Sequence, residues 1–155
     1  MDLLLWRHAE AIDWTPGCDD LSRTLTPRGE KQARRMAQWL DRQLPESTRI
    51  LASPARRTEQ TVLALDRKYK LHDELVPITE NGAKTLLDLV QWPMAKGVVL
   101  VVGHQPCLGE TIAQLVGLKE SECSVKKGAV WWLRSRLRDG QWQTVIVTVQ
   151  SPELL

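Results

Sequence analysis

The run at residues 98–103, VVLVVG, constrains the fold more than any other stretch of the sequence. All of its residues are apolar, so a strand formed here has to be covered on both faces. Such strands are typical of parallel sheets whose connecting helices pack on either side. The run therefore favours an α/β fold.

Along the rest of the chain, short apolar runs alternate with helix candidates. Apolar runs at 3–6 and 49–52 are predicted strands, and residues 81–91 and 106–117 are helix candidates. A longer helix is predicted after Thr26, a good N-cap that is followed by proline, and Ser53 with Pro54 repeats that opening for another helix. The apolar residues at helical spacing in the longer helix are Ala33, Met36, Ala37, Leu40 and Leu44.

The order of strands and helices predicts a mainly parallel sheet with right-handed crossovers. The C-terminal part differs, because two β-rich runs are joined around Asp139 and Gly140, a strong hairpin signal. An antiparallel hairpin at the edge of the sheet would accommodate them. No repeat, low-complexity segment or linker divides the chain, so a single domain is expected over residues 1–155.

Composition excludes several classes of function. The chain has 155 residues, 43% hydrophobic and 26% charged, with a net charge of +2 and both signs scattered. This is ordinary for a soluble globular protein and lacks the basic footprint of a nucleic-acid binder. We see no leader peptide and no apolar run of membrane-spanning length. Three widely spaced cysteines suit a reducing compartment, so we predict a cytoplasmic protein with no nucleic-acid or membrane partner.

Positively charged and titratable residues follow the predicted strands. The first strand ends in Arg7 and His8, and the VVLVVG strand is followed by His104. The strand at 49–52 leads into a helix that carries Arg56 and Arg57 in its first turn. Ligands of open α/β sheets bind beyond the carboxyl ends of the strands. Two histidines and at least two arginines are therefore expected to meet at one edge of the sheet.

This collection of residues suits a phosphate group. Arginine presents a rigid fork of donors to phosphate oxygens, and a helix N-terminus adds partial positive charge. A histidine among cations should have a depressed pKa, and its neutral imidazole is a competent nucleophile. Phosphoryl transfer needs mostly positioning and charge stabilisation, which two arginines and a second histidine could supply without a metal ion.

Competing interpretations are weaker. His72 has no neighbouring signal, and a solitary histidine is more often structural. Arg56 and Arg57 diverge by ~100° on a helix, so only one of them can face the sheet edge. The sequence contains no HExxH metal motif, P-loop or GxSxG elbow, and no cysteine is followed six residues later by arginine. Histidine remains as the nucleophile.

Four segments resemble one known family. Together they resemble the signatures of the histidine phosphatase (phosphoglycerate-mutase-like) superfamily. In chain order, within residues 1 to 110, they are RHAEA, DDLSRTLTPRGEKQA, SPARRTEQT and VVGHQP. In its small size and in this set of motifs, the chain is most similar to the SixA-type phosphohistidine phosphatases. The resemblance implies a three-layer α/β sandwich, with a single histidine-phosphatase-like domain over residues 1–155.

The resemblance also implies roles for individual residues. His8 would be phosphorylated and then hydrolysed, Arg7 and Arg57 would bind the phosphate, and His104 would contact the phosphoryl group. Larger relatives carry an acidic proton donor on an inserted region that is absent or minimal here. Glu74, in DELVP, is the candidate donor, and the competing interpretation is that it faces solvent at the start of a strand.

We therefore expect a metal-independent phosphatase without a cofactor, acting on phosphohistidine of a signalling protein. The alternatives are a small-molecule phosphomonoesterase or mutase, and a binding module that retains the pocket without turnover. The short chain implies an open site with few walls, which favours a protein substrate. Trp14, in the long loop at residues 10–25, is expected to pack within the fold rather than to form part of a rim.

Overall fold

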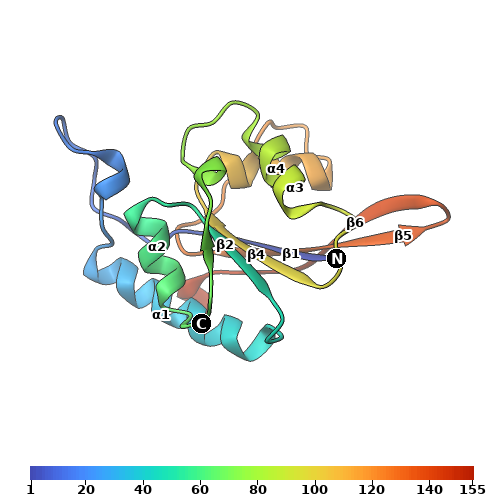
Figure 1. The fold of residues 1–155 in the computed structure, drawn as a ribbon, viewed down its shortest axis with the longest axis horizontal. Coiled ribbons are helices and arrows are strands. Elements are labelled where there is room, and N and C mark those ends of the chain that lie inside the picture. The colour runs from blue at the N-terminus through green and yellow to red at the C-terminus, as the bar shows by residue number, and fades with distance from the viewer.

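The computed structural model describes residues 1–155 and contains a six-stranded mixed sheet with the strand order β3-β2-β4-β1-β5-β6 (Figure 1). The four strands from β3 to β1 are parallel, and β5 and β6 are antiparallel to their neighbours. The mainly parallel sheet and the C-terminal hairpin edge are thus confirmed. The strands are β1 (Asp2–Arg7), β2 (Arg49–Ala52), β3 (Lys70–Leu71), β4 (Val98–Gly103), β5 (Val130–Arg138) and β6 (Gln141–Gln150).

Helices cover both faces of the sheet, which confirms the three-layer α/β architecture. Figure 1 shows α3 and α4 on one side of the sheet and α1 on the other. The helices are α1 (Pro27–Gln43), α2 (Arg56–Leu63), α3 (Gly82–Val90) and α4 (Cys107–Val116), with short 3-10 turns η1 (Asp20–Ser22), η2 (Asp73–Leu75) and η3 (Pro152–Leu154). None of the helices combines the length and the apolar composition that a membrane crossing requires.

Two hydrophobic cores, one on each face of the sheet, explain why the interior residues of the central strands are apolar. In β1, Leu3 and Leu5 point into the core beneath α3 and α4, while Leu4 and Trp6 point into the core beneath α1 and α2. Strand β4 lies between β1 and β2, and its residues 99–102 are completely buried. Both strands are therefore rigid, and they end at the same edge of the sheet.

The beginning of α1 follows the sequence prediction, and the beginning of α2 does not. Thr26 caps α1, because its side-chain oxygen accepts a hydrogen bond from the Gly29 amide (3.0 Å). Helix α2 begins only at Arg56, so the predicted capping by Ser53 is wrong. The Ser53 hydroxyl instead accepts from the Ala55 amide (3.2 Å) and forms a hydrogen bond with Nε2 of His104 (2.8 Å).

The hairpin turns at the predicted residues. Asp139 and Gly140 both have positive φ, at 52° and 74°, which suits a tight two-residue connection between antiparallel strands. The turn places β6 at the edge of the sheet, next to β5. The hairpin therefore lies beyond β1, on the side of the sheet opposite to β2 and β3.

Candidate active site

The two histidines lie together because β1 and β4 are parallel neighbours in register. Arg7, the last residue of β1, pairs with Gly103, the last residue of β4. His8 and His104 follow directly, and their ring centroids are 5.2 Å apart with the planes inclined at 57°. The amide of His8 donates to the carbonyl oxygen of Gly103 (3.1 Å), so the sheet register continues to the histidine itself.

Helix α2 brings one arginine to the same edge. Arg57 is 2% exposed and turned inward, whereas Arg56 is exposed and forms an ion pair with Glu59 (3.2 Å). The arrangement is the one expected for adjacent residues on a helix. A cleft of about 500 Å³ is lined by Arg7 and Arg57 together with His8 and His104. The structure thus brings four of the five predicted site residues together.

The hydrogen bond of His8 assigns its tautomer. Nδ1 lies 2.7 Å from the carbonyl oxygen of Ala9, and a carbonyl can only accept, so Nδ1 carries the proton. Nε2 therefore has a free lone pair. The pKa of His8 is lowered to about 4, chiefly by burial; the charges of Arg57 and Arg7 act in the same direction, and the hydrogen bond to Ala9 opposes them. The neutral ring is the nucleophilic form.

His104 is also held neutral. Burial is the largest cause, followed by the neighbouring His8 and Arg57, and together they lower its pKa to about 2. Its Nε2 hydrogen bonds to the Ser53 hydroxyl, and its Nδ1 is buried without a protein partner. The sequence analysis predicted a lowered histidine pKa because of nearby cations. In the structure, burial lowers the pKa of His104 more than the cations do.

The two arginines are anchored by backbone oxygens and retain unused donors. Arg7 donates from Nη1 to the carbonyl oxygen of Val125 (2.7 Å), and Arg57 donates from Nη1 to that of Asp20 (2.7 Å). Burial lowers the pKa of both guanidinium groups. The Nε–H groups of Arg7 and Arg57 are buried without a protein acceptor. Buried donors of this kind require an acceptor, and an oxyanion in the cleft would supply several.

The long loop at residues 10–25 contributes to the cleft a residue, Asp20, that sequence reasoning did not name. The Asp20 carboxylate lies 3.1 Å from Nη2 of Arg57 and 2.8 Å from Nη2 of Arg23. Burial acts to raise the pKa of Asp20, but the hydrogen bonds and charges of these two arginines hold it below its usual value. Trp14 is 57% exposed and lines the cleft, so its predicted packing within the fold is wrong. The charge-rich segment DDLSR was the available signal.

The structure does not bring Glu74 to the cleft. Glu74 lies in the turn η2 rather than at the start of a strand, and its exposed carboxylate is 3.7 Å from Nδ1 of His72. The carboxylates that line the cleft belong to Asp13 and Asp20. Proton donation by Glu74 therefore stays a prediction without support from the geometry. No group of three or more His, Cys, Asp or Glu side chains is arranged to hold a metal ion.

Comparisons with known proteins agree with this geometry. A model of the histidine phosphatase superfamily (branch 1) matches residues 3–81. A phosphohistidine phosphatase SixA homolog from Haemophilus influenzae is 30% identical over 98% of this chain and 97% of the relative. The chain belongs to the histidine phosphatase superfamily. It is thus a phosphatase, and its four convergent residues lie where the strands of the sheet end.

Two further relatives of this histidine phosphatase are similar in sequence and fold. Phosphohistidine phosphatase SixA of Escherichia coli is 33% identical over 74% of each chain. A solved protein histidine phosphatase SixA complexed with tungstate is 26% identical, covers 99% of each chain and superposes with a TM-score of 0.74. The similarity extends over the whole fold of the histidine phosphatase, including the C-terminal hairpin beyond the matched family model.

Proposed function

We propose that this histidine phosphatase removes the phosphoryl group from phosphohistidine of a signalling protein, through a covalent phosphohistidine on His8 and without a metal ion. The observation that carries the proposal is the free lone pair of Nε2 in a cleft lined by the buried Arg57 and the half-buried Arg7. A nucleophile and fixed positive charge are what phosphoryl transfer requires.

In the first step, Nε2 of His8 attacks phosphorus while the N–P bond of the substrate breaks. The electron pair of that bond stays on the substrate imidazole, which leaves as a neutral ring because its other nitrogen already carries a proton. Arg7 and Arg57 stabilise the negative charge on the phosphoryl oxygens as it moves between the two rings. His104, 5.2 Å from His8 between ring centroids, contacts the same group.

In the second step, water attacks the phosphorus on His8 and the new N–P bond breaks. The electron pair returns to Nε2, and dihydrogen phosphate leaves. Because Nδ1 keeps its proton on the Ala9 carbonyl oxygen, the phosphorylated ring is cationic and is a good leaving group. The bond to Ala9 thus supports both steps: it frees Nε2 for attack and keeps the intermediate labile.

The substrate class is supported by the relatives and by the shape of the cleft. The relatives named SixA are phosphohistidine phosphatases, and one of them holds tungstate, an oxyanion with the geometry of phosphate. In this chain the rim of the cleft is exposed, with Trp14 at 57% and Ile78 at 93%. An open cleft suits a phosphorylated side chain that projects from a protein surface. A small phosphate ester would be enclosed on few sides.

The test is to trap the intermediate. The enzyme is mixed with a peptide carrying radiolabelled phosphohistidine, with and without a chelator, and quenched early at alkaline pH. We expect label on His8 and the same rate of phosphate release in both arms. Loss of activity with chelator would contradict the metal-free mechanism. Stoichiometric retention of phosphate without release would indicate a binding module, and a preference for small phosphate esters would indicate a phosphomonoesterase.

A further inference from the structure

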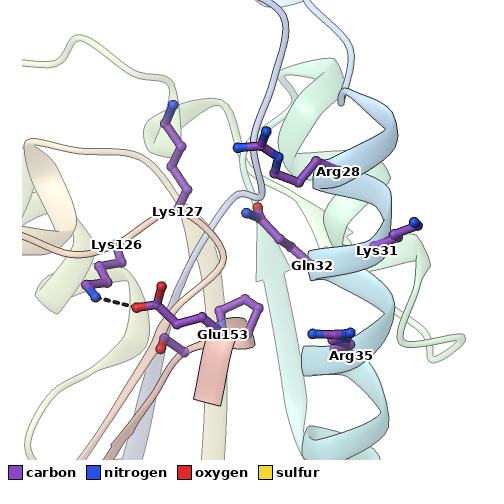
Figure 2. Close-up of a pocket in the computed structure, with 9 residues that line it drawn as sticks. Arg28, Lys31, Gln32, Arg35, Lys126, Lys127 and Glu153 are labelled. Carbon is purple, nitrogen blue, oxygen red and sulfur yellow. Dashed lines mark hydrogen bonds and ion pairs between the residues drawn. The ribbon is translucent and has the colours of Figure 1, made fainter. Parts of the chain in front are cut away.

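A second hollow of about 410 Å³ lies between α1 and the segment that precedes β5 (Figure 2). We call it the basic groove. It contains five of the 21 lysines and arginines of the chain and one of its 19 acidic residues. These charged residues are Arg28, Lys31, Arg35, Lys126, Lys127 and Glu153.

Most of this positive charge has no partner within the molecule. Lys126 forms an ion pair with Glu153, and Arg28 lies 3.5 Å from the carboxylate of Glu10. Lys31, Arg35 and Lys127 form no ion pair. The chain as a whole carries a net charge of only +2, so the groove concentrates charge that is balanced elsewhere. Neighbouring unpaired cations attract an acidic partner over about a Debye length.

The groove adjoins the cleft that holds His8. Lys127 lines both hollows, and Figure 2 shows it across the gap from Arg28, with its side chain directed away from Lys126 and Glu153. The segment that carries Lys127 is held on β1, since the Gly128 amide donates to the carbonyl oxygen of His8 (3.1 Å) and Arg7 donates to that of Val125 (2.7 Å). This wall of the groove is therefore tied directly to the residues of the nucleophile's strand end.

We propose that the basic groove binds an acidic surface of the protein that presents the phosphohistidine, so that carboxylates flanking the phosphorylated residue select the substrate. The inference rests on the proposed function and extends it. A small phosphate ester would fill only the cleft, whereas a protein whose phosphohistidine reaches His8 extends past Lys127 into the groove. The groove offers no aromatic side chain on which a nucleic-acid base could stack.

The experiment compares two phosphohistidine peptides of equal length, one with Asp and Glu flanking the histidine and one with Asn and Gln. We expect the wild type to favour the acidic peptide by about 10-fold in kcat/KM at low salt and to lose the preference at high salt. The double variant R35E/K126E should abolish the preference. It should leave hydrolysis of free phosphoramidate within about two-fold, because neither side chain lines the cleft.

The matched control is R34E/K119E, which changes the net charge equally at two exposed positions outside both hollows. It should keep the preference for the acidic peptide. A preference that survives in R35E/K126E overturns the proposal, as does an equal loss in the control. The neutral variant R35Q/K126Q should give an intermediate preference, which separates loss of attraction from introduced repulsion and from misfolding.

Failure of the proposed function gives a different result. If the wild type hydrolyses neither peptide, the phosphohistidine substrate is wrong, and the groove is then judged by titration with the unphosphorylated acidic peptide. Binding that R35E/K126E abolishes supports the groove as an acidic docking surface, and absence of binding overturns it. Tight binding of an oligouridylate with none of the acidic peptide would likewise overturn it in favour of a nucleic-acid surface.

Discussion

The cleft and the basic groove both gather positive charge, but they hold it differently. In the cleft, Arg57 is buried and Arg7 half-buried, and each donates to a backbone oxygen at 2.7 Å. In the groove, Lys31, Arg35 and Lys127 are exposed and form no ion pair. A buried guanidinium with a fixed direction recognises one oxyanion at close range. Exposed, mobile cations create a field that tolerates many arrangements of carboxylates.

The contrast shows where a small protein can place the groups that select its substrate, apart from the groups that catalyse the reaction. Chemistry needs fixed groups, which here are the residues that follow β1 and β4 and the first turn of α2. Selection of a partner needs only complementary charge nearby, and it can be placed on a helix surface at little cost to the core. Changes to the cleft should therefore alter the reaction itself, whereas changes to the groove should alter which substrate is preferred.

The largest effect is expected from H8A. Removing the nucleophile should lower phosphate release from a phosphohistidine peptide by at least about 10³-fold and abolish covalent labelling. The control is H72A, because His72 lies outside the cleft. Substantial turnover in H8A, with its melting temperature unchanged, would contradict the assignment of the nucleophile.

Arg56 and Arg57, neighbours in α2, allow the effect of an exposed charge on kcat/KM to be compared with that of a buried one. R57Q should lower kcat/KM by about 10² to 10³-fold, because it removes a buried donor from the phosphoryl group. R56Q removes an equal charge one residue away and should stay within about two-fold. Similar losses in both variants would mean that the cleft acts through net charge rather than through a directed contact.

The sequence was informative wherever a functional residue adjoins a strand or helix end. His8 and His104 were predicted because each directly follows an apolar strand, and the parallel pairing of β1 with β4 then brings them together. For Arg56 and Arg57 the pattern indicated only that one of them faces the sheet edge, and the family resemblance singled out Arg57. Asp20 and Lys127 were missed because only tertiary folding places them. The contact of Arg57 with Asp20 spans 37 positions, and that of Arg7 with Val125 spans 118. No local pattern encodes the course of the connecting segments.

Stability should fall in acid because the cleft holds two histidines neutral. Their pKa values in the folded protein are about 4 for His8 and about 2 for His104, below the ordinary value of 6.5. The unfolded chain therefore binds more protons below this value, and the free energy of unfolding decreases as pH falls. From about pH 7 to about pH 5 we expect a loss on the order of 2 kcal/mol for each histidine.

Urea denaturation at the two pH values measures this loss, and H104Q should remove about half of it. Groove variants such as R35E/K126E should leave the pH dependence in this range close to that of the wild type, because they leave both cleft histidines in place. A wild-type stability that does not change between the two pH values would show that the histidines are not held neutral by the fold.

The smallest effect is expected from E74Q. Because the Glu74 carboxylate is exposed and lies beside His72 rather than in the cleft, hydrolysis of phosphohistidine and of an alkyl phosphate should both stay within about two-fold. D13N alters a carboxylate that does line the cleft and serves as the comparison. Selective slowing of the alkyl phosphate by E74Q would restore Glu74 as the proton donor. The imidazole of a phosphohistidine substrate leaves as a neutral ring without an added acid. Hydrolysis of phosphohistidine should therefore be insensitive to both E74Q and D13N.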